Sequence, residues 1–344
     1  MRRIFYRLFK ILFLLVFSLI LEAGEPGELN ISGFVISDFY NIHAAEVKVH
    51  ANYKPKIMRQ VYTDDRSGYQ FRRIYLSFDQ KIEEDFSFKL RFEMNNNDFS
   101  YSKITPEVKD AYLKWQYHDQ HFVAFGISGS PAFAVIEDFW GYRKMEKTAS
   151  DYFEIRSSRD FGISLKGKVL KNINYHFFTG NGESNASEQT GRIDKLHSLS
   201  LSQQAEHLIY EVYTDYRLSQ NGKYDEFTAQ VFTGYKNDYL RWGIQYTYQK
   251  NKLMKSAEKG DIQLLSMPAA WCVSQKLTLA FTYSYYIVSE EQDYRQNVLI
   301  AGIEYKLRKN ISIMPNLLYN DYLFDNAGIK GADIVSRMTM TYNF

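Results

Sequence analysis

The sequence predicts an all-β chain that closes into a transmembrane antiparallel β-barrel of about sixteen strands, with one long loop folded inward. Three observations predict this fold: strict two-residue alternation in segment after segment, links that alternate between short and long, and a polar chain that is rich in aromatic residues. Mean hydropathy is −0.40, yet 17% of residues are aromatic. A single Cys excludes an internal disulfide framework.

The N-terminal residues 1–23 have the pattern of a secretory signal peptide. Basic residues precede an apolar stretch from Ile11 to Leu21, and Ala23 and Gly24 supply small residues for cleavage. An uncleaved N-terminal anchor is the alternative. We therefore expect a signal peptide over 1–23 and the barrel over 24–344. Without residues 1–23 the balance of charges is close to neutral, which gives no indication of nucleic-acid binding.

Apolar and polar residues alternate along the predicted strands. In 86–94 the odd-numbered Ser87, Lys89, Arg91 and Glu93 oppose an apolar even-numbered face, and 240–248 and 277–287 alternate in the same way. Such alternation indicates strands with one apolar and one polar face. The predicted strands are 29–40, 69–81, 85–95, 107–117, 121–128, 158–170, 172–180, 195–203, 206–217, 223–235, 239–250, 261–273, 276–288, 294–308, 310–321 and 333–344.

The links between these strands alternate in length. Short links such as 82–84, 118–120 and 236–238 separate longer ones such as 41–68 and 129–157. Short turns on one rim and long loops on the other are typical of barrels in the bacterial outer membrane. A soluble β-sandwich or propeller is the alternative, but it does not account for the aromatic residues at so many strand ends.

A barrel of this size is expected to surround water. Hydrocarbon leaves only helices and closed barrels as spanning structures, and sixteen strands leave an aqueous channel where eight do not. We expect an interfacial aromatic girdle that includes five side chains: Tyr117, Tyr235, Trp242, Tyr305 and Tyr342.

The link 129–157 is predicted to fold into the lumen and narrow it. Its apolar start, Ala132 to Ile136, is unusual for a loop in water, so we expect these residues to contact the barrel wall. Arg143, Lys144 and Lys147 would then extend into the water of the lumen. The alternatives are an external lid or a contact between subunits, and the link 41–68 could narrow the lumen instead.

The last predicted strand ends on an aromatic residue. Met338, Met340, Tyr342 and Phe344 alternate with polar residues. This pattern resembles the C-terminal signal of outer-membrane barrels, so we expect the barrel-assembly machinery to recognise Phe344.

Several motifs resemble the phosphate-selective porin O and P family, most clearly over 69–182. They are Arg72-Arg73 before Tyr75-Leu76-Ser77-Phe78-Asp79, then 86–93, Lys109-Asp110-Ala111-Tyr112, 126–131, Arg159-Asp160-Phe161-Gly162 with Gly167, and 178–182. The resemblance implies a sixteen-stranded channel, usually trimeric, in the outer membrane, with an inward loop and a basic lumen that favours anions.

The charges expected on the lumen wall are only mildly basic. The candidate pore-lining residues are Arg73, Lys89, Arg91, Lys114, Lys166 and Lys168 on the wall, with Arg143, Lys144 and Lys147 on the loop. Lys81 is a further wall cation, and Asp79, Glu93, Asp110 and Asp160 lie among these charges. Rings of Arg or Lys favour anions. We therefore expect passive diffusion of small hydrophilic solutes with a weak preference for anions, rather than a strictly phosphate-specific channel.

Other functions have weaker support in the sequence. A surface adhesion or scaffold barrel with a blocked lumen is the main alternative. Ser164 and His176 lie on neighbouring predicted strands, but no catalytic or phosphate-binding motif accompanies them, so we expect no enzyme. His118 and His121 lack a third metal ligand nearby, so we expect neither a metal nor a cofactor.

Overall fold

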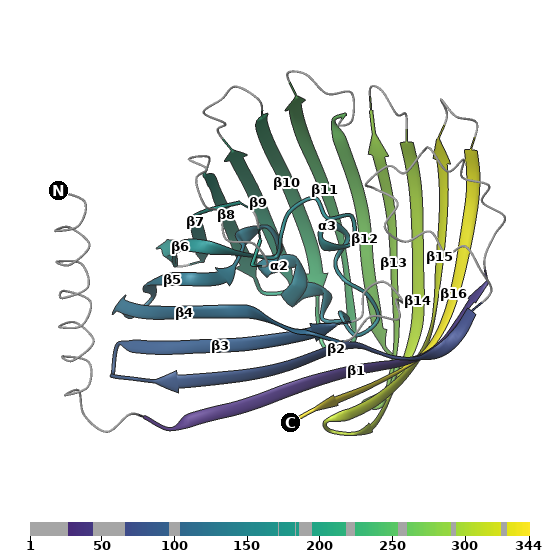
Figure 1. Cartoon of the computed structure of the whole chain (residues 1–344), viewed down its shortest axis with the longest axis horizontal. Helices are drawn as coiled ribbons and strands as arrows, with labels where there is room; N and C mark the ends of the chain where they lie inside the picture. Colours follow the sequence, from purple (N-terminus) through teal and green to yellow (C-terminus); the bar gives the residue numbers. More distant parts are fainter. Residues whose placement is uncertain are drawn as a thin grey trace.

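The chain forms a closed antiparallel barrel of sixteen strands (Figure 1). The computed structural model describes residues 27–43, 66–95, 104–170, 172–182, 184–185, 195–217, 224–253, 260–289, 294–324 and 329–344. The expected signal peptide over 1–23 and most of the link 41–68 lie outside the described residues. None of the helices in these ranges is long and apolar enough to cross a membrane.

Each predicted strand is present, with its ends within a few residues of the prediction. The strands are β1 (Leu29–His43), β2 (Arg66–Lys81), β3 (Phe86–Asn95), β4 (Pro106–His118), β5 (His121–Gly129), β6 (Arg159–Leu170), β7 (Ile173–Gly180), β8 (Leu196–Ala205), β9 (Leu208–Arg217), β10 (Tyr224–Lys236), β11 (Leu240–Leu253), β12 (Ile262–Cys272), β13 (Leu277–Val288), β14 (Tyr294–Arg308), β15 (Ile311–Phe324) and β16 (Ile329–Asn343).

Every strand pairs with its neighbours in sequence, and β1 pairs with β16 to close the barrel. Residues Phe34 to His43 face Asn343 to Ile334 across this junction. At its end the backbone of Phe344 exchanges two hydrogen bonds with Gly33, at 2.9 and 3.0 Å. Among the described strands, closure therefore leaves no unpaired edge, as a sheet in hydrocarbon requires.

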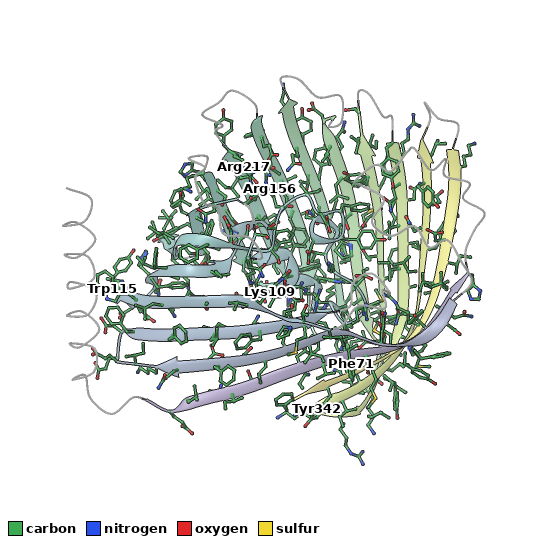
Figure 2. The ribbon with its side chains drawn as sticks, viewed as in Figure 1. Phe71, Lys109, Trp115, Arg156, Arg217 and Tyr342 are labelled. Carbon is green, nitrogen blue, oxygen red and sulfur yellow. The ribbon has the colours of Figure 1, made fainter. Side chains whose placement is uncertain are left out.

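The two faces of the wall have opposite chemistry. The outward face carries exposed apolar and aromatic side chains, including Phe71, Trp115 and Tyr342, which point away from the barrel in Figure 2. The inward face carries buried polar side chains such as Ser77, Gln230 and Thr339. A soluble protein would have the reverse arrangement, because its outer surface meets water.

The expected girdle residues lie mainly on the outward face. Tyr117, Trp242, Tyr305 and Tyr342 are each more than 40% exposed. Tyr235 is partly buried, and its hydroxyl accepts a hydrogen bond from Asn237 at 3.0 Å. The outward surface therefore has the aromatic residues that suit a membrane interface.

The loop between β5 and β6 contains the two helices of the described chain, α2 (Pro131–Trp140) and α3 (Ala149–Tyr152). Ser130 begins α2, its hydroxyl accepting a hydrogen bond from the Ala132 amide, and Pro131 occupies the first turn. Gly141 ends the helix with a φ of 65°, a left-handed conformation that glycine adopts without strain. Figure 1 shows both helices enclosed by the strands.

Candidate functional site

The inward loop, residues 130–158, is attached to the inner face of the wall by side chains of the strands. Gln230 donates to the Ala132 carbonyl at 3.1 Å, and Gln249 donates to the Ile155 carbonyl at 3.0 Å. Arg241 donates to the carbonyl of Phe139 at 3.0 Å. Wall groups thus satisfy loop carbonyls that would otherwise be buried without partners.

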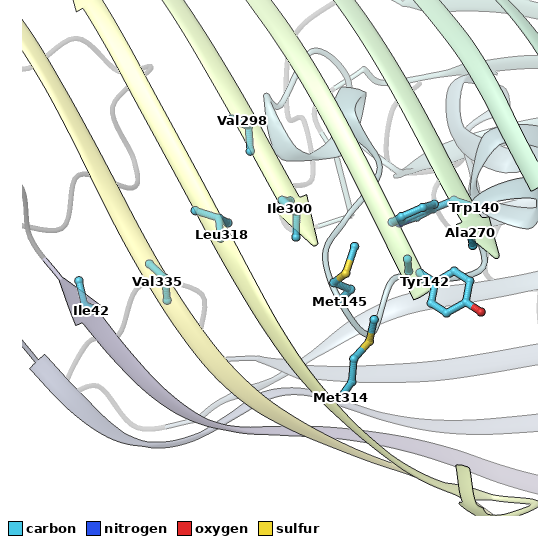
Figure 3. Close-up of a cluster of buried hydrophobic side chains, with 11 residues drawn as sticks. Ile42, Trp140, Tyr142, Met145, Ala270, Val298, Ile300, Met314, Leu318 and Val335 are labelled. Carbon is cyan, nitrogen blue, oxygen red and sulfur yellow. The ribbon is translucent and has the colours of Figure 1, made fainter. Parts of the chain in front are cut away.

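Apolar side chains of the loop contact apolar positions of the wall. Trp140, Tyr142 and Met145 are buried against residues of β12 to β16, among them Met314 and Ile300, as Figure 3 shows. The apolar start of the loop contacts the wall at Tyr213, which lies in one cluster with Ala132 and Phe133. The prediction that the link folds inward and contacts the wall is therefore confirmed.

A buried ion pair attaches the end of the loop to β9 and β10. Arg156 contacts both oxygens of Asp215, at 2.5 and 2.7 Å, and one oxygen of Glu226 at 2.7 Å. Tyr213 also donates to Asp215, at 2.6 Å. Figure 2 shows Arg156 in the barrel interior. This contact orders the return of the chain into β6.

The opposite wall, β2 to β6, carries a cluster in which four cations share two carboxylates. Arg73 and Lys109 both contact Glu93, at 3.0 and 2.6 Å. The second carboxylate, Asp110, pairs with Arg91 at 3.2 Å and with Arg159 at 2.6 Å. Cations therefore outnumber acids within this cluster, which we call the wall cluster.

None of the six predicted pore-lining lysines belongs to the wall cluster. Lys114 and Lys166 flank the ring of Phe122, their Nζ atoms 4.5 and 5.8 Å from its centroid. Neither forms an ion pair within the described residues. Lys168, on the same face of β6 as Lys166, is exposed.

Lys89, the fourth predicted wall lysine, pairs with Asp79 at 2.7 Å. The charge of this lysine is therefore balanced locally.

Two of the three predicted loop cations have acidic partners in the folded loop. Arg143 pairs with two loop acids, Glu137 at 2.6 Å and Asp151 at 3.0 Å, and Lys144 pairs with Glu304 of β14. These pairings were not predicted, because the sequence does not reveal which acids the folded loop approaches. Lys147 is partly exposed and forms no ion pair within the described part of the chain.

At the tip of the loop, burial and neighbouring charges have opposite effects on the pKa values of Lys144 and Glu146. Burial alone would raise the pKa of Glu146, but Arg337 and Arg72 lower it to about 2. For Lys144, burial lowers the pKa and the contact with Glu304 acts in the opposite direction. Glu146 is therefore an ionised carboxylate at neutral pH.

Comparisons with known proteins agree with this geometry. The family model for "Phosphate-selective porin O and P" matches residues 47–132. The predicted resemblance to this family is confirmed over 69–132, whereas the motifs between 159 and 182 lie outside the match. No curated protein matches the sequence.

Solved outer-membrane proteins share the fold at low sequence identity. The outer-membrane channel DcaP of Acinetobacter baumannii is 14% identical, with a TM-score of 0.68 over 92% of this chain and 97% of that one. The anion-selective porin from Comamonas acidovorans is 14% identical, with a TM-score of 0.64 over 93% of this chain and 100% of its own. The trimer form of OmpT from Vibrio cholerae is 12% identical, with a TM-score of 0.59 over 93% and 100%. The chain has the fold of an outer-membrane porin.

Sequence reasoning missed several charged residues of this porin-like lumen. Arg72 and Lys109 lie at register shifts, where a β-bulge turns an additional side chain inward. Alternation alone would place Arg72 on the outward face. Arg241 and Arg337, in contrast, lie on the polar faces of alternating strands, so the sequence contained a signal for both.

The serine and histidine considered for catalysis are in contact. Ser164 Oγ lies 2.8 Å from His176 Nε2, and both residues are buried. Within the described strands no acidic side chain hydrogen-bonds to this ring, so the triad arrangement is incomplete. No group of three His, Cys, Asp or Glu residues in the same ranges is placed to hold a metal.

Proposed function

We propose that this protein is an outer-membrane porin through which small hydrophilic solutes diffuse passively, with a weak preference for anions. The observation that carries the proposal is the inward loop, which crosses a barrel whose inner face is polar. A polar interior in a closed barrel of sixteen strands suits a water-filled path. The loop would narrow that path on the side of the wall cluster.

The preference for anions follows from the local charge balance. Four cations share two carboxylates in the wall cluster, and Lys114 and Lys166 have no ion-pair partner there. The field in a narrow, partly desolvated path depends on such local excess rather than on the net charge of the chain. The candidate pore-lining set therefore remains Arg73, Lys89, Arg91, Lys114, Arg143, Lys144, Lys147, Lys166 and Lys168. A family described as phosphate-selective suggests phosphate among the permeating anions.

Export and assembly would follow the usual route for such barrels. Residues 1–23 would act as a signal peptide, 24–344 would form the barrel, and Phe344 would present the C-terminal signal to the barrel-assembly machinery. A homotrimer is supported by the likeness to the trimer form of OmpT. The apolar outward surface would contact outer-membrane lipid. We assign no enzymatic activity and no cofactor.

Planar-bilayer recording of the purified protein tests the proposal. A channel gives discrete conductance steps, and asymmetric salt gives a reversal potential on the anion side. Liposome swelling with small sugars tests the alternative, a scaffold barrel with a blocked lumen. Absence of both conductance steps and swelling would contradict the channel proposal.

A further inference from the structure

The tip of the inward loop lies at the junction where the first and last strands close the barrel. We propose that Arg72 and Arg337 are positioning residues that hold the loop against this junction, so that loop position and barrel closure stabilise each other. We call Asp38, Arg72, Glu146 and Arg337 the seam clamp. Its effect on solute passage rests on the proposed channel function, whereas its effect on barrel stability does not.

Both arginines hold the same segment of loop backbone. Arg72 donates to the Met145 carbonyl at 2.6 Å and also to the Lys144 carbonyl. Arg337 donates to the Met145 carbonyl at 3.0 Å. One carbonyl therefore accepts from guanidinium groups on two different strands, which fixes the tip of the loop from two directions.

The charges of the seam clamp balance within it. Asp38 contacts Arg72 at 2.9 Å, and Glu146 contacts Arg337 at 3.1 Å and Arg72 at 3.8 Å. The side chain of Asp38 is 0% exposed and that of Arg337 is 4% exposed. Loss of Arg337 or of Glu146 would therefore break a buried ion pair of the seam clamp, which is strongly destabilising.

The members of the seam clamp meet only in a closed barrel. Asp38 lies on β1, Arg72 on β2 and Arg337 on β16, and β1 is the strand between the other two. Thr339 of β16 donates to Asp38 at 2.6 Å across the junction. The loop tip therefore bridges strands from opposite ends of the sequence, which opposes their separation.

A local irregularity of β2 makes this arrangement possible. The register between β1 and β2 shifts between Ile36 and Ser37, so Ile36 faces Arg73 and Ser37 faces Phe71. Arg72 is the additional residue at this bulge, and it turns inward beside Arg73. The bulge thus supplies one arginine to the seam clamp and one to the wall cluster.

Arg241 provides a matched control. It also donates to loop carbonyls, those of Phe139 at 3.0 Å and Trp140 at 3.3 Å. It lies on β11, however, far from the junction in the order of strands. Loss of Arg241 should therefore loosen the end of α2 without weakening closure.

The first test compares the thermal unfolding of full-chain variants refolded in detergent, followed by the strand signal in circular dichroism. We expect Arg337→Gln and Glu146→Gln to unfold at clearly lower temperatures than Arg241→Gln. Arg337→Lys keeps the charge but loses the several N–H donors of the guanidinium group. Its unfolding temperature should lie between those of Arg337→Gln and the wild type. Equal unfolding temperatures for the Gln variants of Arg337, Glu146 and Arg241 would overturn the proposal. If Arg337→Gln does not refold, the unfolding temperatures of Glu146→Gln and Arg241→Gln are compared instead, and equal values would overturn the proposal.

The second test asks whether the seam clamp acts through the junction. Ile36 and Thr341 are cross-strand partners on β1 and β16, three positions from the hydrogen-bonded pair Gly33 and Phe344. Alternation makes theirs a non-hydrogen-bonded pair, with a Cα separation of about 4.5 Å that a disulfide can span.

We therefore combine Ile36→Cys and Thr341→Cys with Cys272→Ser, so that no other thiol competes. Oxidation should restore most of the unfolding temperature that Arg337→Gln loses, and reduction should remove the gain. A disulfide that forms but restores nothing would show that Arg337 acts only within the loop, which would overturn the coupling. A wild-type barrel that unfolds as expected but conducts no ions would refute the proposed function and leave the seam clamp intact.

Discussion

Replacing Lys114 and Lys166 together by glutamine should lower the ratio of anion to cation permeability of the channel about tenfold. Their Nζ atoms lie 4.5 and 5.8 Å from the Phe122 centroid, and neither pairs with an acid within the described residues. The interaction energy between a unit charge and a monovalent ion about 6 Å away is about 0.7 kcal/mol in water. At a salt concentration of about 0.1 M the Debye length is about 10 Å, and this screening reduces the interaction energy by about half.

Two lysines therefore stabilise a passing anion by about 0.7 kcal/mol and destabilise a passing cation by as much. The difference of about 1.5 kcal/mol corresponds to about a tenfold change in the ratio of anion to cation permeability. The reversal potential in asymmetric potassium chloride measures that ratio directly.

The matched control removes a cation together with its acid. Lys89 and Asp79 pair at 2.7 Å, so Lys89→Gln with Asp79→Asn leaves the local charge unchanged and should leave the reversal potential near the wild-type value. Our reasoning would be refuted if the Lys114 and Lys166 variant kept the wild-type reversal potential. It would also be refuted if the neutral-pair variant shifted the potential equally.

Three further predictions concern the inward loop. Deletion of residues 133–147 should raise single-channel conductance, and an unchanged value would place the constriction elsewhere. Arg156→Met leaves the buried Asp215 without its ion-pair partner, so the free energy of unfolding in urea should fall by about 3–5 kcal/mol. A loss below about 1 kcal/mol would contradict the importance of this buried pair. The pKa of Glu146 is lowered from 4.5 to about 2, so its contribution to stability is full above about pH 4.5 and is lost as the pH falls toward 2. Glu146→Gln should therefore unfold at a lower temperature than wild type at pH 7, and this difference should shrink between pH 4.5 and pH 2.

The sequence was sufficient to predict which side chains of the barrel wall face outward and which face the lumen. In 277–287 the alternation correctly separates the outward Leu279 and Phe281 from the inward Thr278 and Thr282. This succeeds because successive side chains of a strand point to opposite faces, and lipid and lumen select different residues for each. The inward course of the loop was also predictable, because exposure of its apolar first residues to water would be unfavourable.

The sequence by itself determined the alternation, the order of the strands, the closed barrel and the candidate cations. Only the tertiary structure decided which of those cations are neutralised. Arg143 and Lys144 meet their acids only when the loop folds, and Arg72 reaches the lumen only because β2 contains a bulge. The physical reason is that alternation is a local property of the chain, whereas ion pairing depends on distances between residues that closure brings together from opposite ends of the sequence.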